Sequence, residues 1–159
     1  MTQPFSILPR NVGPVGVPSL GPGSPALAGQ NDNLIAINAT LQVDLIGQCC
    51  SESMGYMPYS GTGGQADFVR AANRSKGGKA IIVLPSTAKG DTISRIVPTL
   101  TPGAHVTTTK NDVNYVVSEY GVAQLRGKSA KQRAEALIGI AHPDFRSELR
   151  EAARKMRLF

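Results

Sequence analysis

The first regular pattern along the chain is an alternation of apolar and polar residues over positions 35–45. Apolar side chains occupy the odd positions from Ile35 to Leu45, and the even positions are mainly polar and include Asn38. A period of two over this length predicts a β-strand with its odd-numbered face buried, which can break or bend within the run. Asn38 would then lie on the opposite, polar face, either against solvent or beside a cleft.

Further strands are expected where short apolar runs stand between turn-forming residues. The clearest is the continuous apolar run over residues 80–84, bounded by Gly78 and Pro85, which predicts a buried strand. Because turn signals separate the apolar runs that follow, three shorter strands are expected, at residues 94–97, 106–109 and 113–117.

Helical spacing of apolar residues occurs in two regions. One helix is expected over residues 65–74, and another is expected to be capped by Ser129 and to end at His142 and Pro143. Pro143 also suits the first turn of one more helix near the C-terminus. Strands with helices between and after them predict an α/β sandwich, in which the polar face of one strand lets part of the sheet border a cleft.

Residues 1–30 differ in composition from the rest of the chain. Six prolines alternate there with five glycines, so this segment is expected to be flexible or extended, with the folded domain over residues 31–159. No basic region followed by an apolar core marks a signal peptide, and no apolar run approaches a membrane span. We therefore expect a cytoplasmic protein that does not engage the membrane.

The chain carries a formal net charge of +6, much of it in the last third. A basic surface suits nucleic acid or anionic small molecules such as the phosphates of coenzyme A (CoA), and it is also common on ordinary solvated surfaces. The basic residues of the last third lie in amphipathic helices without interleaved aromatic residues. This arrangement argues against a nucleic-acid partner.

The sharpest local motif is the glycine-rich stretch Ser-Gly-Thr-Gly-Gly at residues 60–64. Glycine permits close approach of a ligand, and a helix that starts after Gly64 would point its N–H groups and positive dipole end at that ligand. Such a place suits a phosphate or the oxyanion of a thioester. The same sequence is also typical of a tight turn, and it matches neither a Walker loop nor a dinucleotide-binding fingerprint.

Two carboxylates and two cysteines complete the candidate chemistry. Glu119 follows an apolar strand and Glu52 lies in a loop-like stretch; a carboxylate in a cleft can act as a base or a nucleophile, although most exposed carboxylates do neither. Cys49 and Cys50 are adjacent, so neither a useful disulfide nor a zinc site is expected. We expect no metal.

Five blocks in a fixed order resemble one known family. They include Ser-Gly-Thr-Gly-Gly-Gln-Ala-Asp-Phe at 60–68, Ser-Arg-Ile-Val-Pro at 94–98 and Ser-Glu-Tyr-Gly at 118–121, and together they span residues 31–48, 60–68, 84–98, 106–127 and 141–146. The chain resembles the C-terminal part of the acetyl-CoA hydrolase/transferase family, nearest its 4-hydroxybutyrate CoA-transferase branch.

This resemblance implies a fold, a reaction and a set of site residues. The fold is an α/β fold of the CoA-transferase type (NagB/RpiA-type), an open sheet flanked by helices, here as an incomplete domain. The reaction moves CoA from an acyl-CoA to a small carboxylic acid through a glutamyl-CoA thioester, with CoA as a substrate and not a permanently bound cofactor. The resemblance places Asn38, Gly61, Gly63 and Gly64 at the CoA, makes the Gly61 N–H an oxyanion donor, and puts Glu119 near a second carboxylate of the site.

The resemblance also implies that the attacking glutamate is missing. In the family it precedes the block that begins at Asn31, whereas Glu52 is the first glutamate of this chain. The chain is therefore expected to be inactive alone and to work with a complementary N-terminal chain or as a homo-oligomer. Three alternatives stay open: a non-catalytic module that binds CoA or a protein partner, a truncated fragment without function, and a nucleic-acid binder.

Overall fold

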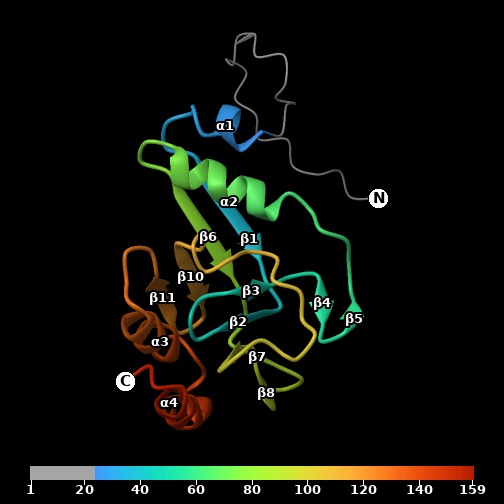
Figure 1. Cartoon of the computed structure of the whole chain (residues 1–159), viewed down its shortest axis with the longest axis vertical. Coiled ribbons are helices and arrows are strands. Elements are labelled where there is room, and N and C mark those ends of the chain that lie inside the picture. Colours follow the sequence, from blue (N-terminus) through green and yellow to red (C-terminus); the bar gives the residue numbers. More distant parts are fainter. Residues whose placement is uncertain (1–23) are drawn as a thin grey trace.

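The computed structural model describes residues 24–159 and has a four-stranded central sheet (Figure 1). Its strands follow the order β1-β6-β10-β11. The strands β1, β6 and β10 are parallel, and β11 returns antiparallel to β10. With helices packed on this mixed sheet, the predicted α/β class is confirmed. The bounds are β1 Ile35–Ala39, β6 Lys79–Val83, β10 Tyr115–Ser118 and β11 Gly121–Gln124.

Seven shorter strands form one small sheet and two hairpins in the described part of the chain. The small sheet has the order β3-β2-β9, and β4 pairs with β5 as β7 does with β8. The strand expected at 94–97 is divided between β8 and β9, and at 106–109 only an isolated bridge between Cys49 and Thr108 forms. The bounds are β2 Gln42–Asp44, β3 Cys49–Cys50, β4 Ser53–Met54, β5 Met57–Pro58, β7 Thr87–Ala88, β8 Ile93–Ser94 and β9 Ile96–Val97.

The helices agree closely with the sequence pattern. Helix α2 has the predicted bounds, and the Ser129 hydroxyl accepts from the Gln132 N–H to cap α3. Helix α1 forms where the chain was expected to be flexible or extended, because Ser24 caps it and it packs on α2; the rest of that expectation lies outside the described residues. The bounds are α1 Pro25–Ala28, α2 Gln65–Arg74, α3 Ala130–Gly139, η1 Pro143–Phe145 and α4 Arg146–Lys155.

The alternating stretch 35–45 is two strands in two different sheets. The chain turns at Thr40, whose hydroxyl donates to the Cys50 carbonyl at 2.8 Å. The apolar residue that β1 buries is Ala36, at an even position, whereas beyond the turn the buried apolar residues are Val43 and Leu45, at odd positions. The predicted burial of the odd face is confirmed for Val43 and Leu45 and is wrong for β1.

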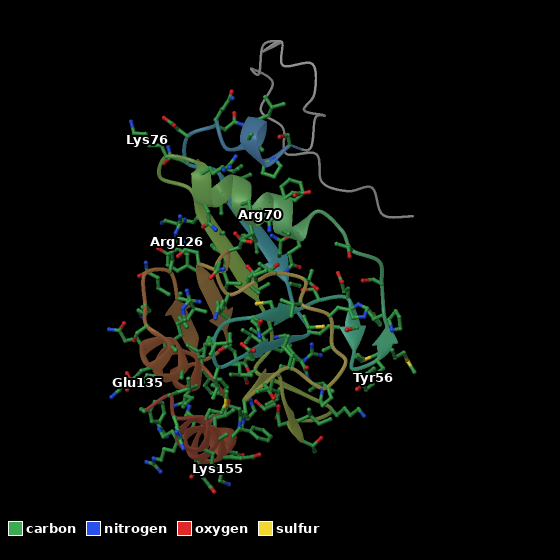
Figure 2. All side chains as sticks on the ribbon, viewed as in Figure 1. Tyr56, Arg70, Lys76, Arg126, Glu135 and Lys155 are labelled. Atoms are coloured by element: carbon green, nitrogen blue, oxygen red, sulfur yellow. The ribbon has the colours of Figure 1, made fainter. Side chains whose placement is uncertain are left out.

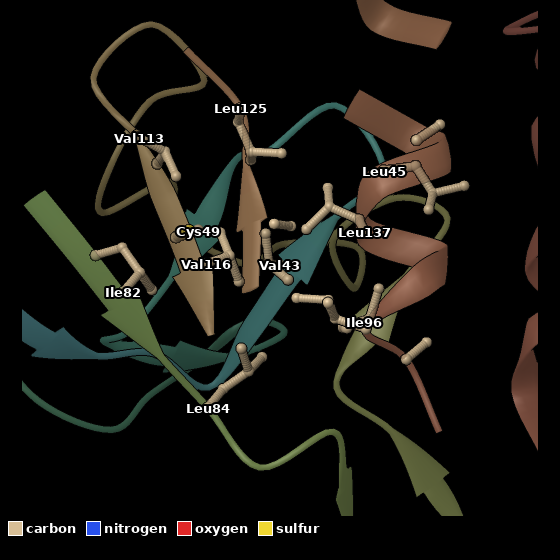
Figure 3. Close-up of a cluster of buried hydrophobic side chains, with 14 of the residues drawn as sticks. Val43, Leu45, Cys49, Ile82, Leu84, Ile96, Val113, Val116, Leu125 and Leu137 are labelled. Atoms are coloured by element: carbon tan, nitrogen blue, oxygen red, sulfur yellow. The ribbon is translucent and has the colours of Figure 1, made fainter. Parts of the chain in front are cut away.

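The hydrophobic core lies on one face of the central sheet. Helix α2 packs on β1 and β6, and α3 packs on β11. The small sheet adds Val43 and Ile96, and α3 adds Leu137 (Figure 3). The central sheet contributes the side chains that its register places on this face, Ala36, Ala80, Ile82, Val116 and Ala123.

The other face of the central sheet has no helix over it in the described part of the chain. Its apolar residues, called here the open face, are Ile35, Ile37, Ile81, Val83, Val117 and Val122. The exposed fraction is 64% for Ile37 and 63% for Val122. Parallel strands are ordinarily covered on both faces. An apolar face of this kind is typical of a surface that packs against another layer.

Candidate functional site

A pocket of about 580 Å³ lies at the carboxyl ends of the three parallel strands. Ala39, Val83 and Val117, which stand side by side in the sheet register, line it together with residues just beyond the strand ends. The carboxyl ends of parallel strands are where open α/β sheets bind ligands. The remaining lining residues are Thr40, Leu41, Ser51, Tyr59, Leu84, Pro85, Arg95, Ser118 and Glu119.

Glu119 is the first residue after β10, and its side chain is fixed by Ser86. The Ser86 hydroxyl donates to Oε1 of Glu119 at 2.5 Å, and the Ser86 N–H donates to Oε2 at 2.9 Å. Desolvation acts to raise the pKa of Glu119, but hydrogen bonds from Ser86 and from its own N–H, together with nearby His142, hold this pKa below its usual value. Glu119 is therefore a positioned carboxylate that stays ionised.

Replacing Ser86 with alanine should raise the pKa of Glu119 toward that of an ordinary glutamate. The hydroxyl bond is lost, whereas the N–H bond of residue 86 remains. Because the folded-state pKa is lowered, the contact stabilises the wild-type fold above the ordinary pKa, and this stabilisation is lost as the pH falls through the folded-state pKa. NMR titration of the Glu119 carboxyl in both proteins measures the change. The exposed Glu135 serves as internal control, and an unchanged Glu119 pKa would contradict the role of Ser86.

His142 brings the C-terminal part of the chain to this carboxylate. Its predicted place at a helix boundary is confirmed, since its Nδ1 accepts from the Asp144 N–H at the start of η1. The imidazole also packs edge-on against the Tyr120 ring, with 5.4 Å between ring centroids. His142 thus contacts the residue that follows Glu119, although 23 positions separate it from Glu119 in sequence.

Asn38 lies on the core face of β1 and not on a solvent-facing polar face. It stands beside Ile82 in the register, and its Nδ2 is buried without a hydrogen-bond partner among the described residues. A buried donor left unpaired is costly. The predicted orientation of Asn38 is therefore wrong, because α2 and the core pack on the even-numbered face of β1.

The glycine stretch 60–64 precedes α2 as predicted, with Gly64 at the helix N-cap. A Cβ added to Gly61 or Gly63 would meet no atom within 4 Å, and neither residue has a positive φ. Neither packing nor backbone strain therefore requires glycine at these two positions. The structure does not bring this stretch or Asn38 into the pocket that Glu119 lines.

Glu52 is the second carboxylate that the sequence offered as a candidate. Glu52 is buried, and its Oε1 lies 3.6 Å from Nδ1 of His105, but it does not line the pocket.

Sequence reasoning did not single out Ser86 or Arg95 as site residues. The available signal was that each is a polar residue beside an apolar strand, a pattern shared with many loop residues.

Residues 24–159 contain no group of three or more His, Cys, Asp or Glu side chains suited to a metal ion. Within the same range, no helix has the length and apolar character needed to cross a membrane. Both cysteines are buried and free, and desolvation by burial, with the nearby Asp44 and Cys50, raises the pKa of the Cys49 thiol.

The mixed sheet with its helices and the pocket at the strand ends define an α/β protein whose fold is similar to that of solved CoA-transferase structures. In sequence, residues 17–153 match the family of the acetyl-CoA hydrolase/transferase C-terminal domain. The chain belongs to this family, which confirms the resemblance drawn from the five sequence blocks.

Named relatives agree with this assignment. The chain is 71% identical over 128 residues to a succinyl-CoA:cyclohexane-1-carboxylate CoA transferase of Geobacter metallireducens, covering 80% of the chain and 29% of that protein. It is 57% identical over 132 residues to the 4-hydroxybutyrate coenzyme A transferase of Clostridium kluyveri, covering 83% and 31%. The crystal structure of RipA from Yersinia pestis is 51% identical, with a TM-score of 0.81, and the match covers 86% of the chain and 31% of RipA. The chain thus spans about a third of the length of these relatives.

Proposed function

We propose that the chain is the part of a CoA-transferase that binds CoA and the carboxylic acid, and that a complementary polypeptide segment completes the enzyme. The observation that carries this proposal is the continuity between the pocket and the open face. Ala39, Val83 and Val117 line the pocket, and Val83 and Val117 also belong to the open face. A segment that packs on the open face would therefore also wall the pocket.

The occupant proposed for the open face is the part of the protein that its relatives carry outside the matched region. Those relatives have about two thirds of their length outside the match, which is enough for a further layer. Fully burying one Ile or Val side chain contributes about 1.5–3 kcal/mol, so covering Ile35, Ile37 and Val122 stabilises such a layer appreciably. By analogy with the family, the finished fold would be the NagB/RpiA-type open sheet with helices on both faces.

The proposed chemistry divides between the two segments. The complementary segment supplies the glutamate that attacks the thioester and carries CoA as a glutamyl-CoA thioester until the acceptor acid takes it. This chain supplies the Gly61 N–H as an oxyanion donor, Asn38 as a partner for CoA, and Glu119 as a fixed carboxylate. The open space beside Gly61 and Gly63 supports the oxyanion role, whereas the role of Asn38 rests on the family resemblance alone.

The test is to complement the chain with the part of the 71% identical relative that lies outside the matched region, produced as a separate polypeptide. We expect neither polypeptide to act alone and the mixture to convert succinyl-CoA and cyclohexane-1-carboxylate into succinate and cyclohexane-1-carboxyl-CoA. Chromatography of the CoA thioesters separates transfer from hydrolysis, which would release free CoA. Transfer by the isolated chain at the rate of the mixture would contradict the proposal.

Two further outcomes discriminate among the alternatives. Calorimetry with CoA that shows binding, combined with a mixture that stays inactive, would favour a non-catalytic CoA-binding module. Dimerisation of the chain alone through the open face, seen as protection of Ile37 and Val122 in hydrogen exchange, would assign that face to a homo-oligomer instead of a complementary segment.

A further inference from the structure

Arg95 is a cationic side chain of the pocket that no described acidic residue pairs. It stands between β8 and β9, and its backbone is held on both sides: its N–H donates to the Ser86 carbonyl at 2.8 Å, and its carbonyl accepts from the Val43 N–H at 3.0 Å. Its Nε is buried without a hydrogen-bond partner. No carboxylate of residues 24–159 lies within ion-pair distance of its guanidinium.

The unpaired Nε–H of Arg95 is costly to bury. Arginine is always protonated, with N–H donors and no acceptor, and a buried charged donor that is left unpaired loses its hydration without compensation. An arginine side chain without a partner, on a backbone held in place beside the pocket, is suited to receive an anion from outside the chain.

Three other polar side chains that line the pocket, those of Thr40, Ser118 and Glu119, are already engaged within the chain. The Thr40 hydroxyl donates to Cys50 and the Ser118 hydroxyl to Ile140. Glu119 is held by Ser86, the same residue whose carbonyl fixes Arg95. Arg95 is therefore the charged group of the pocket that remains available to a ligand.

We propose that Arg95 binds the carboxylate of the acid that exchanges CoA. A planar guanidinium matches a carboxylate through two parallel N–H···O bonds. The pocket walls beside it are apolar and suit a short hydrocarbon chain: Leu41, Val83, Leu84, Pro85 and Val117. The ligand class is therefore a small aliphatic or alicyclic monocarboxylate. The inference rests on the proposed function and assigns to this residue the recognition of the acid.

The test is an NMR titration of the arginine Nε–H signals of the chain with acetate, butyrate and cyclohexane-1-carboxylate. The Arg95 signal should shift and saturate with each acid, whereas acetamide and butyramide, which have no charge, should leave it in place. Arg95→Lys keeps the charge but loses the planar fork and should weaken binding about 10-fold or more. Arg126→Lys, on an exposed arginine outside the pocket, should leave binding unchanged.

Three results would overturn the inference: no saturable shift at Arg95, equal shifts with the amides, or unchanged acid affinity in Arg95→Lys. The wild-type titration decides even if the variant fails to fold. In an active complemented mixture, Arg95→Lys should raise the KM for the acid about 10-fold and leave the KM for the acyl-CoA unchanged. An inactive mixture with an intact Arg95 titration would count against the proposed function alone, whereas an active mixture in which Arg95→Lys leaves the acid KM unchanged would count against the Arg95 assignment alone.

Discussion

Replacing Ile37 with aspartate should abolish CoA transfer by the complemented mixture while the isolated chain stays folded. Ile37 is 64% exposed on β1 of the isolated chain, so a charged side chain there meets water and costs little. In the assembled protein the same carboxylate would be buried without a partner, which costs about 3 kcal/mol or more and weakens association about 100-fold or more. Transfer activity at a fixed concentration of both polypeptides, with association followed by calorimetry, measures the effect.

Two matched variants separate loss of the interface from a general effect of charge. Ile37→Val keeps an apolar side chain on the open face and should retain association. Met156→Asp places the same charge at an exposed position at the end of α4 and should leave both association and activity unchanged. Wild-type association of the Ile37→Asp chain would mean that the open face is not the surface that the complementary segment covers.

Replacing Leu137 with alanine should lower the free energy of unfolding of the chain by about 2–5 kcal/mol. Leu137 lies on α3 and is fully buried in the core cluster that also contains Leu45 and Val43 (Figure 3). The alanine removes apolar contacts and leaves a cavity that the neighbouring small sheet and β11 cannot close, since their own side chains are already packed. Chemical denaturation followed by circular dichroism measures the loss.

The control for Leu137 is an alanine on the outward side of the same helix. Glu135 projects from α3 away from the sheet (Figure 2), and its ion pair with Lys131 is exposed and 4.0 Å long. Glu135→Ala should therefore change stability by less than about 0.5 kcal/mol. If Leu137→Ala were as stable as Glu135→Ala, the packing of α3 on the sheet would be contradicted.

Local features of the fold could be predicted from the sequence because neighbouring residues determine them. Helix α2 has its predicted bounds, Ser129 caps α3, and a strand forms at residues 79–83, although only its Ala80 and Ile82 face is buried. The antiparallel return of β11 was not predicted, because Gly121–Gln124 is too short and mixed in polarity to show a strand period.

The choice of which face of β1 is buried illustrates what the sequence pattern could not determine. A period of two shows that two faces exist, but which one is buried depends on which layer packs against the sheet. In this chain α2 and the small sheet lie on the side of Ala36, and the turn at Thr40 moves β2 into another sheet. The odd positions of β1 therefore form the open face, and Asn38 faces the core.

The sequence by itself determined the family and most of the helices and main strands, because motif order and hydrophobic periodicity are written in residues close along the chain. Only the tertiary structure brought Ser86, Arg95, Glu119 and His142 into one region, because the parallel order of β1, β6 and β10 gathers their carboxyl ends at one edge. It also decided that one face of the sheet is open, since exposure depends on contacts between distant segments, and only three-dimensional packing sets these.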